Sequence, residues 1–283
     1  MKKIPYGRHY IDKDDINSVK KSLTFDKITT GSLVKKFENK ITKYTKSKFS
    51  LVCSSGTSAL YLAIKSIKIK KNDIVVMPSI NFISSYNVCK ILGAKIFLAD
   101  VDPISGQITP KTLQKCITEN KIKKIKCVIN MYLGGSAQNI KEFYVLKKKY
   151  KFYLIEDACH SFGSKYLVNK IKFNVGSCKH SDICTFSFHP LKSITTGEGG
   201  AITTNNKKIY EYIKIIRSHG IKRSKNHWQY DVIESSFNFR ISDINSALGI
   251  SQMTKLNSFL QKRREIIKNY ISFFKKYKDF IKI

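Results

Sequence analysis

Short apolar segments alternate with helical patterns over residues 49–155, and this alternation constrains the fold more than any other feature of the sequence. The apolar segments have the length of strands and lie at 49–53, 74–77, 95–99, 125–129 and 152–155. The stretches between them, at 57–67, 84–92, 110–119 and 139–150, place apolar residues at helical spacing. Strands joined by helices of this length need crossover connections, so the pattern predicts an α/β domain in which helices sandwich a mostly parallel sheet.

Further patterns flank this alternation. Residues 14–23 and 32–44 precede it with helical spacing, and Ser32 is a candidate N-cap behind Gly31. Two apolar segments, 183–188 and 200–203, then enclose a polar loop, and helical patterns follow at 207–217, 242–255 and 261–274. No internal repeat, low-complexity linker or change of composition separates these segments from the alternation.

The sequence predicts a globular protein without a membrane span. Its 283 residues are 42% hydrophobic, which is enough for a large buried core. No stretch approaches the roughly 18 to 20 apolar residues that a spanning helix needs, and the N-terminus lacks the apolar run of a signal peptide. We therefore expect a cytoplasmic protein with no membrane partner.

The seven cysteines indicate reduced thiols. They are odd in number and scattered, without a Cys-x-x-Cys pair. A metal site is the alternative where His180 and His189 come near Cys178 and Cys184, but this spacing is not typical of ligands. We expect no metal.

The formal net charge of +32 raises the question of nucleic-acid binding. Only six of the 52 basic residues are arginine, whereas proteins that read base edges rely on arginine forks. The lysines are spread along the whole chain. We expect no nucleic-acid partner, and a basic surface that attracts anionic substrates such as nucleotide diphosphates.

A Ser/Gly/Thr turn follows the first predicted strand. Residues 54–58 read Ser-Ser-Gly-Thr-Ser and lead into a helical pattern. The free N–H groups of such a turn, the helix dipole and the hydroxyls of Thr57 and Ser58 suit a phosphate group. Taken alone, the motif fits an ordinary Ser/Thr cap equally well.

Acidic and imidazole side chains follow the fifth predicted strand, in the segment Glu156-Asp157-Ala158-Cys159-His160. Ligands gather at the carboxyl ends of strands in open α/β sheets. A carboxylate there keeps a pyridine nitrogen protonated, as pyridoxal chemistry requires, and Asp157 is the candidate. A helix cap at Asp157 and a simple polar neighbour at His160 are the alternatives.

Lys192 lies in the polar loop between two apolar segments and is followed by Thr-Thr-Gly-Glu-Gly-Gly at 195–200. A lysine in such a loop can form an imine with an aldehyde. Because lysine is so abundant in this chain, the surrounding motif carries the inference, and the lysine alone does not.

Taken together, these motifs resemble the fold-type I, DegT-type aminotransferases that act on nucleotide-linked keto-sugars. The matching segments are 56–60, 156–157, 187–192, 195–201, 217–220 and 237–240, which occur in the family's order from about Tyr6 onward. Residues 186–189 and 194–196 are most similar to the pseudaminic acid subgroup. The resemblance implies a pyridoxal 5'-phosphate (PLP) enzyme that transfers an amino group from glutamate to the C4 ketone of a UDP-linked 4-keto-6-deoxy-N-acetylhexosamine.

The resemblance also implies a role for each site residue. Lys192 would carry the cofactor as a Schiff base and act as acid and base, and Asp157 would pair with the pyridine nitrogen. Phe82, for which a core position is the alternative, would stack on the ring, and His160 would contact its hydroxyl side. The phosphate site would comprise Gly56, Thr57, Ser58 and Ser187, with Asn238 reaching it from the neighbouring subunit of a homodimer.

Three regions are expected from the same resemblance. Residues 1–30 form an N-terminal arm and first helix, 31–257 a PLP-binding large domain, and 258–283 the start of a C-terminal small domain. Family members continue further into that small domain, so we expect a fragment in which it is largely missing.

Two alternatives to this function stay open. Because a fold does not fix a substrate, the acceptor can be another nucleotide keto-sugar, on the way to legionaminic acid, perosamine or a 3-amino sugar. The other alternative is an inactive family member that binds the cofactor and serves regulation.

Overall fold

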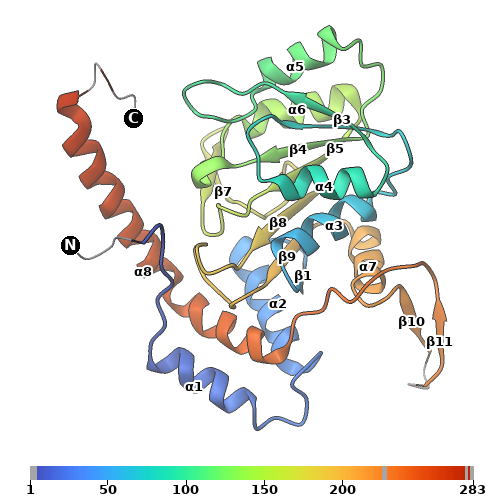
Figure 1. Cartoon of the computed structure of the whole chain (residues 1–283), viewed down its shortest axis with the longest axis vertical. Helices are drawn as coiled ribbons and strands as arrows, with labels where there is room; N and C mark the ends of the chain where they lie inside the picture. The colour runs from blue at the N-terminus through green and yellow to red at the C-terminus, as the bar shows by residue number, and fades with distance from the viewer. Residues whose placement is uncertain (1–4, 225–227, 278–279, 281–283) are drawn as a thin grey trace.

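A seven-stranded sheet between helices forms the centre of the computed structural model, which describes residues 5–224, 228–277 and 280 (Figure 1). The strand order is β1-β9-β8-β5-β4-β2-β3. The bounds are Phe49–Cys53 for β1, Ile74–Pro78 for β2, Lys95–Ala99 for β3, Cys127–Met131 for β4, Tyr153–Asp157 for β5, Ile183–Ser187 for β8 and Gly200–Thr204 for β9. The predicted α/β fold is confirmed.

Six of these strands are parallel, and β9 is antiparallel to both of its neighbours. The carboxyl ends of β1, β5 and β8 therefore meet the amino end of β9 at one edge of the sheet. Gly200 pairs with Cys53 on one side and with Ser187 on the other, and Asp157 pairs with Thr185. All three motifs found in the sequence consequently lie at this edge, where open α/β sheets bind ligands.

Helices cover both faces of the sheet. In the described part of the chain they are α1 Lys13–Ser22, α2 Ser32–Thr45, α3 Gly56–Ser66, α4 Ile83–Ile91, α5 Pro110–Glu119, α6 Ile140–Tyr150, α7 Lys207–Ile216 and α8 Asp243–Phe274, with 3-10 turns at Leu133–Gly135 and Lys275–Tyr277. No described helix is both long and apolar enough to cross a membrane.

Alternation along the strands divides the core between the two faces. Cys127 and Ile129 of β4 pack with α3, α4 and α7, whereas Val128 packs with α5 and α6 on the other face. Helices α2 and α8 cover the rest of the second face, where Phe37 and Leu256 belong to one apolar cluster. Burial on both faces explains why the central strands read as short, almost wholly apolar segments.

The start of α2 differs from the prediction. Gly31 is the N-cap, not Ser32, and no side chain of this turn caps the helix. Asp243, the buried first residue of α8, instead accepts hydrogen bonds from the N–H groups of Gly31 (2.6 Å), Leu33 (2.9 Å) and Val34 (3.3 Å). The cap is supplied by a segment distant in sequence, which local patterns cannot reveal.

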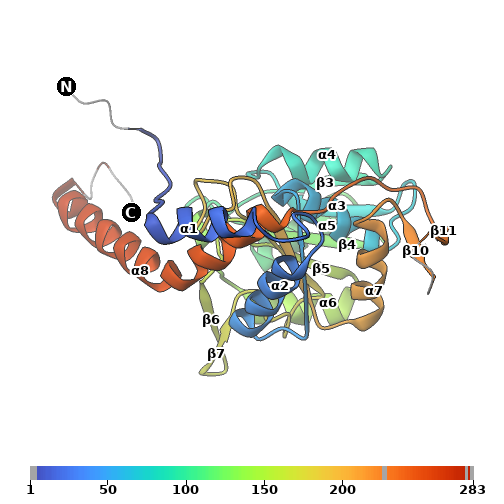
Figure 2. The same cartoon turned by 90° about the horizontal axis from the view of Figure 1, so that it is seen from below.

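Helix α8 is continuous through residues 256–260, where we predicted a gap between two helices. The domain boundary that we expect after residue 257 stays a prediction. Its last buried residue is Leu256, and the helix then leaves the sheet (Figures 1 and 2). The predicted gap, residues 256–260, reads Leu-Asn-Ser-Phe-Leu; it contains no Gly or Pro, so nothing in it breaks the helix.

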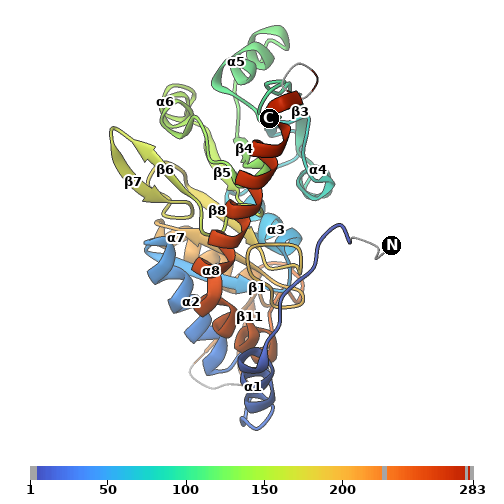
Figure 3. The same cartoon turned by 90° about the vertical axis from the view of Figure 1, so that its left-hand side faces the viewer.

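Helix α1 lies along the first half of α8 (Figures 2 and 3). Two hairpins, β6 Lys165–Val168 with β7 Ile171–Asn174 and β10 Ile221–Arg223 with β11 Tyr230–Val232, stand outside the main sheet. We did not predict these hairpins because their strands are short and rich in polar residues.

Candidate active site

The amino end of α3 packs against the first residue of β9. Ser55 caps the helix, with its Oγ accepting a hydrogen bond from Ser58 N at 3.0 Å. The Ser58 hydroxyl is engaged within the same cap, 2.8 Å from Ser54 Oγ and 2.9 Å from Ser55 Oγ. A Cβ atom on Gly200 would come within 2.3 Å of Ser55 O, so only glycine allows this approach. The glycine turn after Lys192 thus brings α3 to the sheet edge.

The first two N–H groups of α3, those of Gly56 and Thr57, have no hydrogen-bond partner in the described part of the chain. Thr57 is exposed, whereas Ser187 is 8% exposed and lies beside the turn. A Cβ atom on Gly56 would lie 3.1 Å from Ser187 Oγ. Free N–H groups at the positive end of a helix dipole, next to a hydroxyl, form a site for a phosphate group.

Asp157 ends β5 with its carboxylate buried and held by neutral donors. Its side chain is 2% exposed. Oδ2 accepts a hydrogen bond from Ser85 Oγ at 3.3 Å, and Oδ1 accepts one from Cys159 N at 3.2 Å. Because neither donor is charged, the carboxylate can still bind a protonated ring nitrogen. Ser85 was missed in the sequence, since a serine inside a helical pattern carries no distinctive signal.

Phe82 is the N-cap residue of α4 and 67% exposed. It lies one turn before Ser85, whose N–H donates to Phe82 O at 3.4 Å. The contact of Ser85 with Asp157 therefore places Phe82 at the same edge of the sheet. Its exposure excludes the alternative of a core phenylalanine.

The loop that carries Lys192 is closed on itself by hydrogen bonds. Phe188 O accepts from Thr195 Oγ1 at 3.1 Å and from Thr196 N at 3.0 Å. Within the loop, Lys192 N donates to His189 O at 2.9 Å. These hydrogen bonds define the main-chain conformation of the loop.

Helix α8 holds the same loop at two points. Asn245 Nδ2 donates to Thr196 O at 2.6 Å, and Arg263 Nη2 donates to Lys192 O at 2.7 Å. Neither contact was predicted, because both join residues that are far apart in sequence.

A cavity of about 820 Å³ opens beside this loop. Lys192 and His160 line it, together with residues 6–10 of the N-terminal arm, Leu133, Gly134 and part of α8. This volume is in the range of pockets that bind cofactors and small substrates.

The pKa values of residues 159 and 160 report the charges around them. Burial, and then the positive charge of Lys192, lower the pKa of His160 below 6.5, although Asp157 opposes the shift. Burial, and then the negative charge of Asp157, raise the pKa of the Cys159 thiol, and Lys192 opposes this shift. For both side chains, the positive charge of Lys192 lowers the pKa and the negative charge of Asp157 raises it. Lys192 and Asp157 are therefore both close enough to influence Cys159 and His160.

Asn238 lies outside this group. It is exposed and forms a bridge with Ser218, and its Oδ1 accepts a hydrogen bond from Arg240 N at 3.1 Å. Its contact with a phosphate in a second subunit stays a prediction.

The segment around Cys178, where a metal site was the alternative, contains a buried thiol and a hydrogen-bonded histidine. Burial raises the pKa of Cys178 to about 12, and its thiol donates to Thr203 O. His180 Nδ1 is 2.9 Å from Tyr166 OH. Within the described ranges no group of three or more His, Cys, Asp or Glu side chains could hold a metal ion.

These residues fit PLP by the kinds of group they present. N–H groups and a hydroxyl are available for its phosphate, Asp157 for its ring nitrogen and the amine of Lys192 for its aldehyde. The side-chain amide of Asn81, next to Phe82, is buried and has no partner in the described part of the chain. Unpaired buried polar groups are rare in proteins, so this amide also indicates a position for a ligand.

This strand order, with a lysine in the loop between β8 and β9 and a carboxylate at the end of β5, defines an α/β fold of the PLP-dependent transferase type. The chain belongs to the DegT/DnrJ/EryC1/StrS aminotransferase family, which matches residues 9–283.

The chain is similar to three known proteins. The chain is 39% identical over 273 residues to the UDP-4-amino-4,6-dideoxy-N-acetyl-β-L-altrosamine transaminase of Campylobacter jejuni, covering 96% of this chain and 70% of that protein. Helicobacter pylori PseC, an aminotransferase involved in the biosynthesis of pseudaminic acid, has a TM-score of 0.87 and 30% identity, covering 97% and 71% of the two chains. NtdA from Bacillus subtilis, solved with bound cofactor PMP, has a TM-score of 0.83 and 25% identity, covering 95% and 59%.

Proposed function

We propose that this chain is a PLP-dependent transaminase that moves an amino group from glutamate to the C4 ketone of a UDP-linked 4-keto-6-deoxy-N-acetylhexosamine. One observation carries the proposal: Lys192, Asp157 and the amino end of α3 share one edge of the sheet. The similarity to the Campylobacter jejuni enzyme, which is named for an amino sugar linked to UDP, supports this choice of substrate.

The amino end of α3 would hold the cofactor phosphate. The N–H groups of Gly56 and Thr57 have no partner among the residues that the structure describes, and the Ser187 hydroxyl lies beside Gly56. The helix dipole adds a favourable interaction with the phosphate charge. Ser58, whose hydroxyl is engaged by Ser54 and Ser55, would act through the shape of the turn.

Asp157 and Lys192 would have different roles in the reaction. PLP, when bound, supplies an aldehyde that accepts an amino group and a protonated ring that withdraws electrons from the reacting carbon. The buried carboxylate of Asp157 would hold the proton on the ring nitrogen. Lys192 Nζ would anchor the cofactor and then, as acid and base, move the proton between the substrate carbon and the cofactor.

Phe82 and His160 would fix the orientation of the ring. The phenyl group of Phe82 would stack on an aromatic ligand, since this residue is 67% exposed. The lowered pKa keeps His160 neutral at pH 7. Its imidazole ring could then donate one hydrogen bond and accept another, beside the hydroxyl group of the cofactor ring. The cytoplasmic location and the homodimer, with Asn238 reaching the partner's phosphate site, belong to the same proposal.

Amino transfer with defined substrates tests this function. We expect the purified chain with PLP, glutamate and the UDP-linked 4-keto sugar to produce the 4-amino sugar and 2-oxoglutarate, both detected by mass spectrometry. Lys192→Ala should give no product. Conversion of only a GDP- or dTDP-linked keto-sugar would contradict the choice of substrate, and cofactor binding without any amino transfer would favour the regulatory alternative.

A further inference from the structure

We propose that Arg8 of the N-terminal arm and Arg263 of α8 form an anion subsite in the cavity beside Lys192, and that this subsite binds the diphosphate of the nucleotide-linked substrate. The identity of the ligand rests on the proposed function. The anion subsite itself rests on the charges and contacts of the cavity wall.

The charged side chains that line the cavity are all cationic in the described part of the chain. They are Arg8, Lys192, Lys262 and Arg263, and no Asp or Glu side chain lines the cavity with them. Lys192 is assigned to the cofactor, and Lys262 Nζ is 3.4 Å from Glu265 Oε2, which offsets its charge. The two arginines therefore supply the charge that remains for an anion.

Both arginines keep donors free for a ligand. Arg8 forms no ion pair or hydrogen bond with any residue that the structure describes. Arg263 uses Nη2 on Lys192 O (2.7 Å) and Leu191 O (3.4 Å), and its Nε and Nη1 groups have no hydrogen-bond partner in the described part of the chain. Guanidinium groups bind phosphate oxygens in pairs of hydrogen bonds, so two of them match the two phosphates of a diphosphate.

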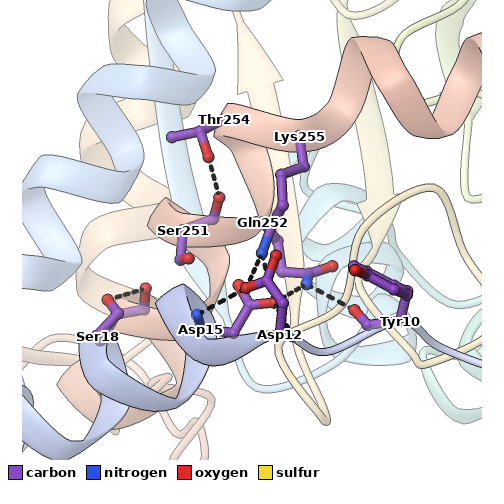
Figure 4. A network of polar contacts seen from close by, with 9 residues as sticks. Tyr10, Asp12, Asp15, Ser18, Ser251, Gln252, Thr254 and Lys255 are labelled. Atoms are coloured by element: carbon purple, nitrogen blue, oxygen red, sulfur yellow. Dashed lines mark hydrogen bonds and ion pairs between the residues drawn. The ribbon is translucent and has the colours of Figure 1, made fainter.

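A partly buried clamp, made of Asp12, Asp15, Gln252 and Lys255, fixes the arm in this position (Figure 4). Lys255 Nζ lies 2.7 Å from Asp12 Oδ1 and 2.6 Å from Asp15 Oδ2. Gln252 Nε2 donates to Asp15 Oδ2 at 2.8 Å and to Tyr10 O at 2.9 Å. The clamp holds the main chain two residues after Arg8, and the Lys255 ammonium offsets part of the negative charge of the two carboxylates.

The arm also contacts the loop that carries Lys192. A Cβ atom on Gly7 would lie 2.6 Å from Leu191 Cδ2, so the arm passes directly over this loop. The Tyr10 ring packs edge-on against Phe259 of α8, with centroids 5.9 Å apart. An anion held by Arg8 would therefore place the attached sugar in the cavity that Lys192 lines.

Binding of UDP tests the subsite, with inorganic pyrophosphate as a probe that lacks the nucleoside. Calorimetric titration uses the full chain loaded with PLP. We expect Arg8→Ala and Arg263→Ala each to weaken the affinity for both ligands by about tenfold or more, because hydrogen bonds to charged groups are of this strength. Arg8→Lys should retain part of the affinity, and Lys13→Ala, at an exposed lysine outside the cavity, should retain all of it.

Three outcomes would overturn the inference: no binding of UDP or pyrophosphate by the unsubstituted chain, unchanged affinity in Arg8→Ala, or an equal loss in Lys13→Ala, which would mean a general charge effect. Thermal unfolding and borohydride trapping of PLP on each variant verify that it is folded. Failure of the proposed function is a separate result, since amino transfer would then be absent in the unsubstituted chain whatever the variants bind.

Discussion

Ser85 Oγ on α4 donates a hydrogen bond to Asp157 Oδ2 at the end of β5, across 3.3 Å, and both side chains are buried. The second carboxylate oxygen is held by Cys159 N. The orientation of Asp157 therefore depends on helix α4, whose N-cap residue is Phe82, so one element would position both the ring-stacking side chain and the carboxylate.

Replacing Ser85 by alanine should reduce kcat/KM for amino transfer by about tenfold, because a hydrogen bond to a carboxylate is worth roughly 1.5 kcal/mol or more. Ser85→Thr should restore most of the activity. The matched control is Ser84→Ala, a buried neighbour that is not among the described residues hydrogen-bonded to the Asp157 carboxylate. Steady-state kinetics checks this prediction, and equal losses in the two alanine variants would contradict it.

Replacing Gly200 by alanine should lower the free energy of unfolding by about 1–3 kcal/mol and weaken PLP binding, because the new Cβ atom meets the Ser55 carbonyl and displaces the start of α3. Thr57→Val is the companion variant. It removes only an exposed hydroxyl, so it should weaken PLP binding without a change in stability. Urea unfolding and PLP titration measure the two effects, and a fully stable Gly200→Ala chain would refute the packing argument.

The clamp between α1 and α8 should contribute to stability mainly through Asp15, whose side chain is fully buried. Lys255→Met leaves this carboxylate without its cation and should lower the free energy of unfolding by about 3 kcal/mol. Lys115→Met breaks an ion pair in which both side chains are about 60% exposed and should cost less than about 1 kcal/mol. Similar urea midpoints for the two variants would be inconsistent with this account.

The protonation of His160 should depend on Lys192. Since burial and the positive charge of Lys192 hold the His160 pKa below 6.5, the imidazole gains its proton only as the pH falls below that value. In the PLP-free protein, Lys192→Ala removes the neighbouring cation and favours the protonated ring, so the His160 pKa should rise. NMR titration of the imidazole carbons measures it, with Lys262→Ala as control; a pKa that stays constant or falls in Lys192→Ala would show that the two side chains do not interact.

The strands of the sheet could be predicted because each one corresponds to a short, continuous stretch of the sequence. The strands of the main sheet read as short apolar segments, and most of them are buried on both faces. Strands β1 and β3 were predicted at their observed bounds and the other strands of this sheet within two residues. Helix α5, with a Thr cap and proline in its first turn, was also predicted at its bounds.

Contacts between distant segments could not be predicted in this way. The cap of α2 by Asp243, the hydrogen bond of Arg263 to Lys192 O and the support of Asp157 by Ser85 leave no periodic pattern in the sequence. Such contacts depend on the packing of the whole fold. The roles of Lys192 and Asp157 were accessible only through the motif around them and its resemblance to a family.

Trapping of the cofactor tests the central claim most directly. The full chain is incubated with PLP, reduced with borohydride and mapped by mass spectrometry, alongside Lys192→Ala. We predict one stoichiometric adduct on the peptide that contains Lys192, together with a visible absorption band that Lys192→Ala lacks. Adducts spread over other lysines, or an equal yield in Lys192→Ala, would contradict the assignment of Lys192 as the cofactor-binding residue.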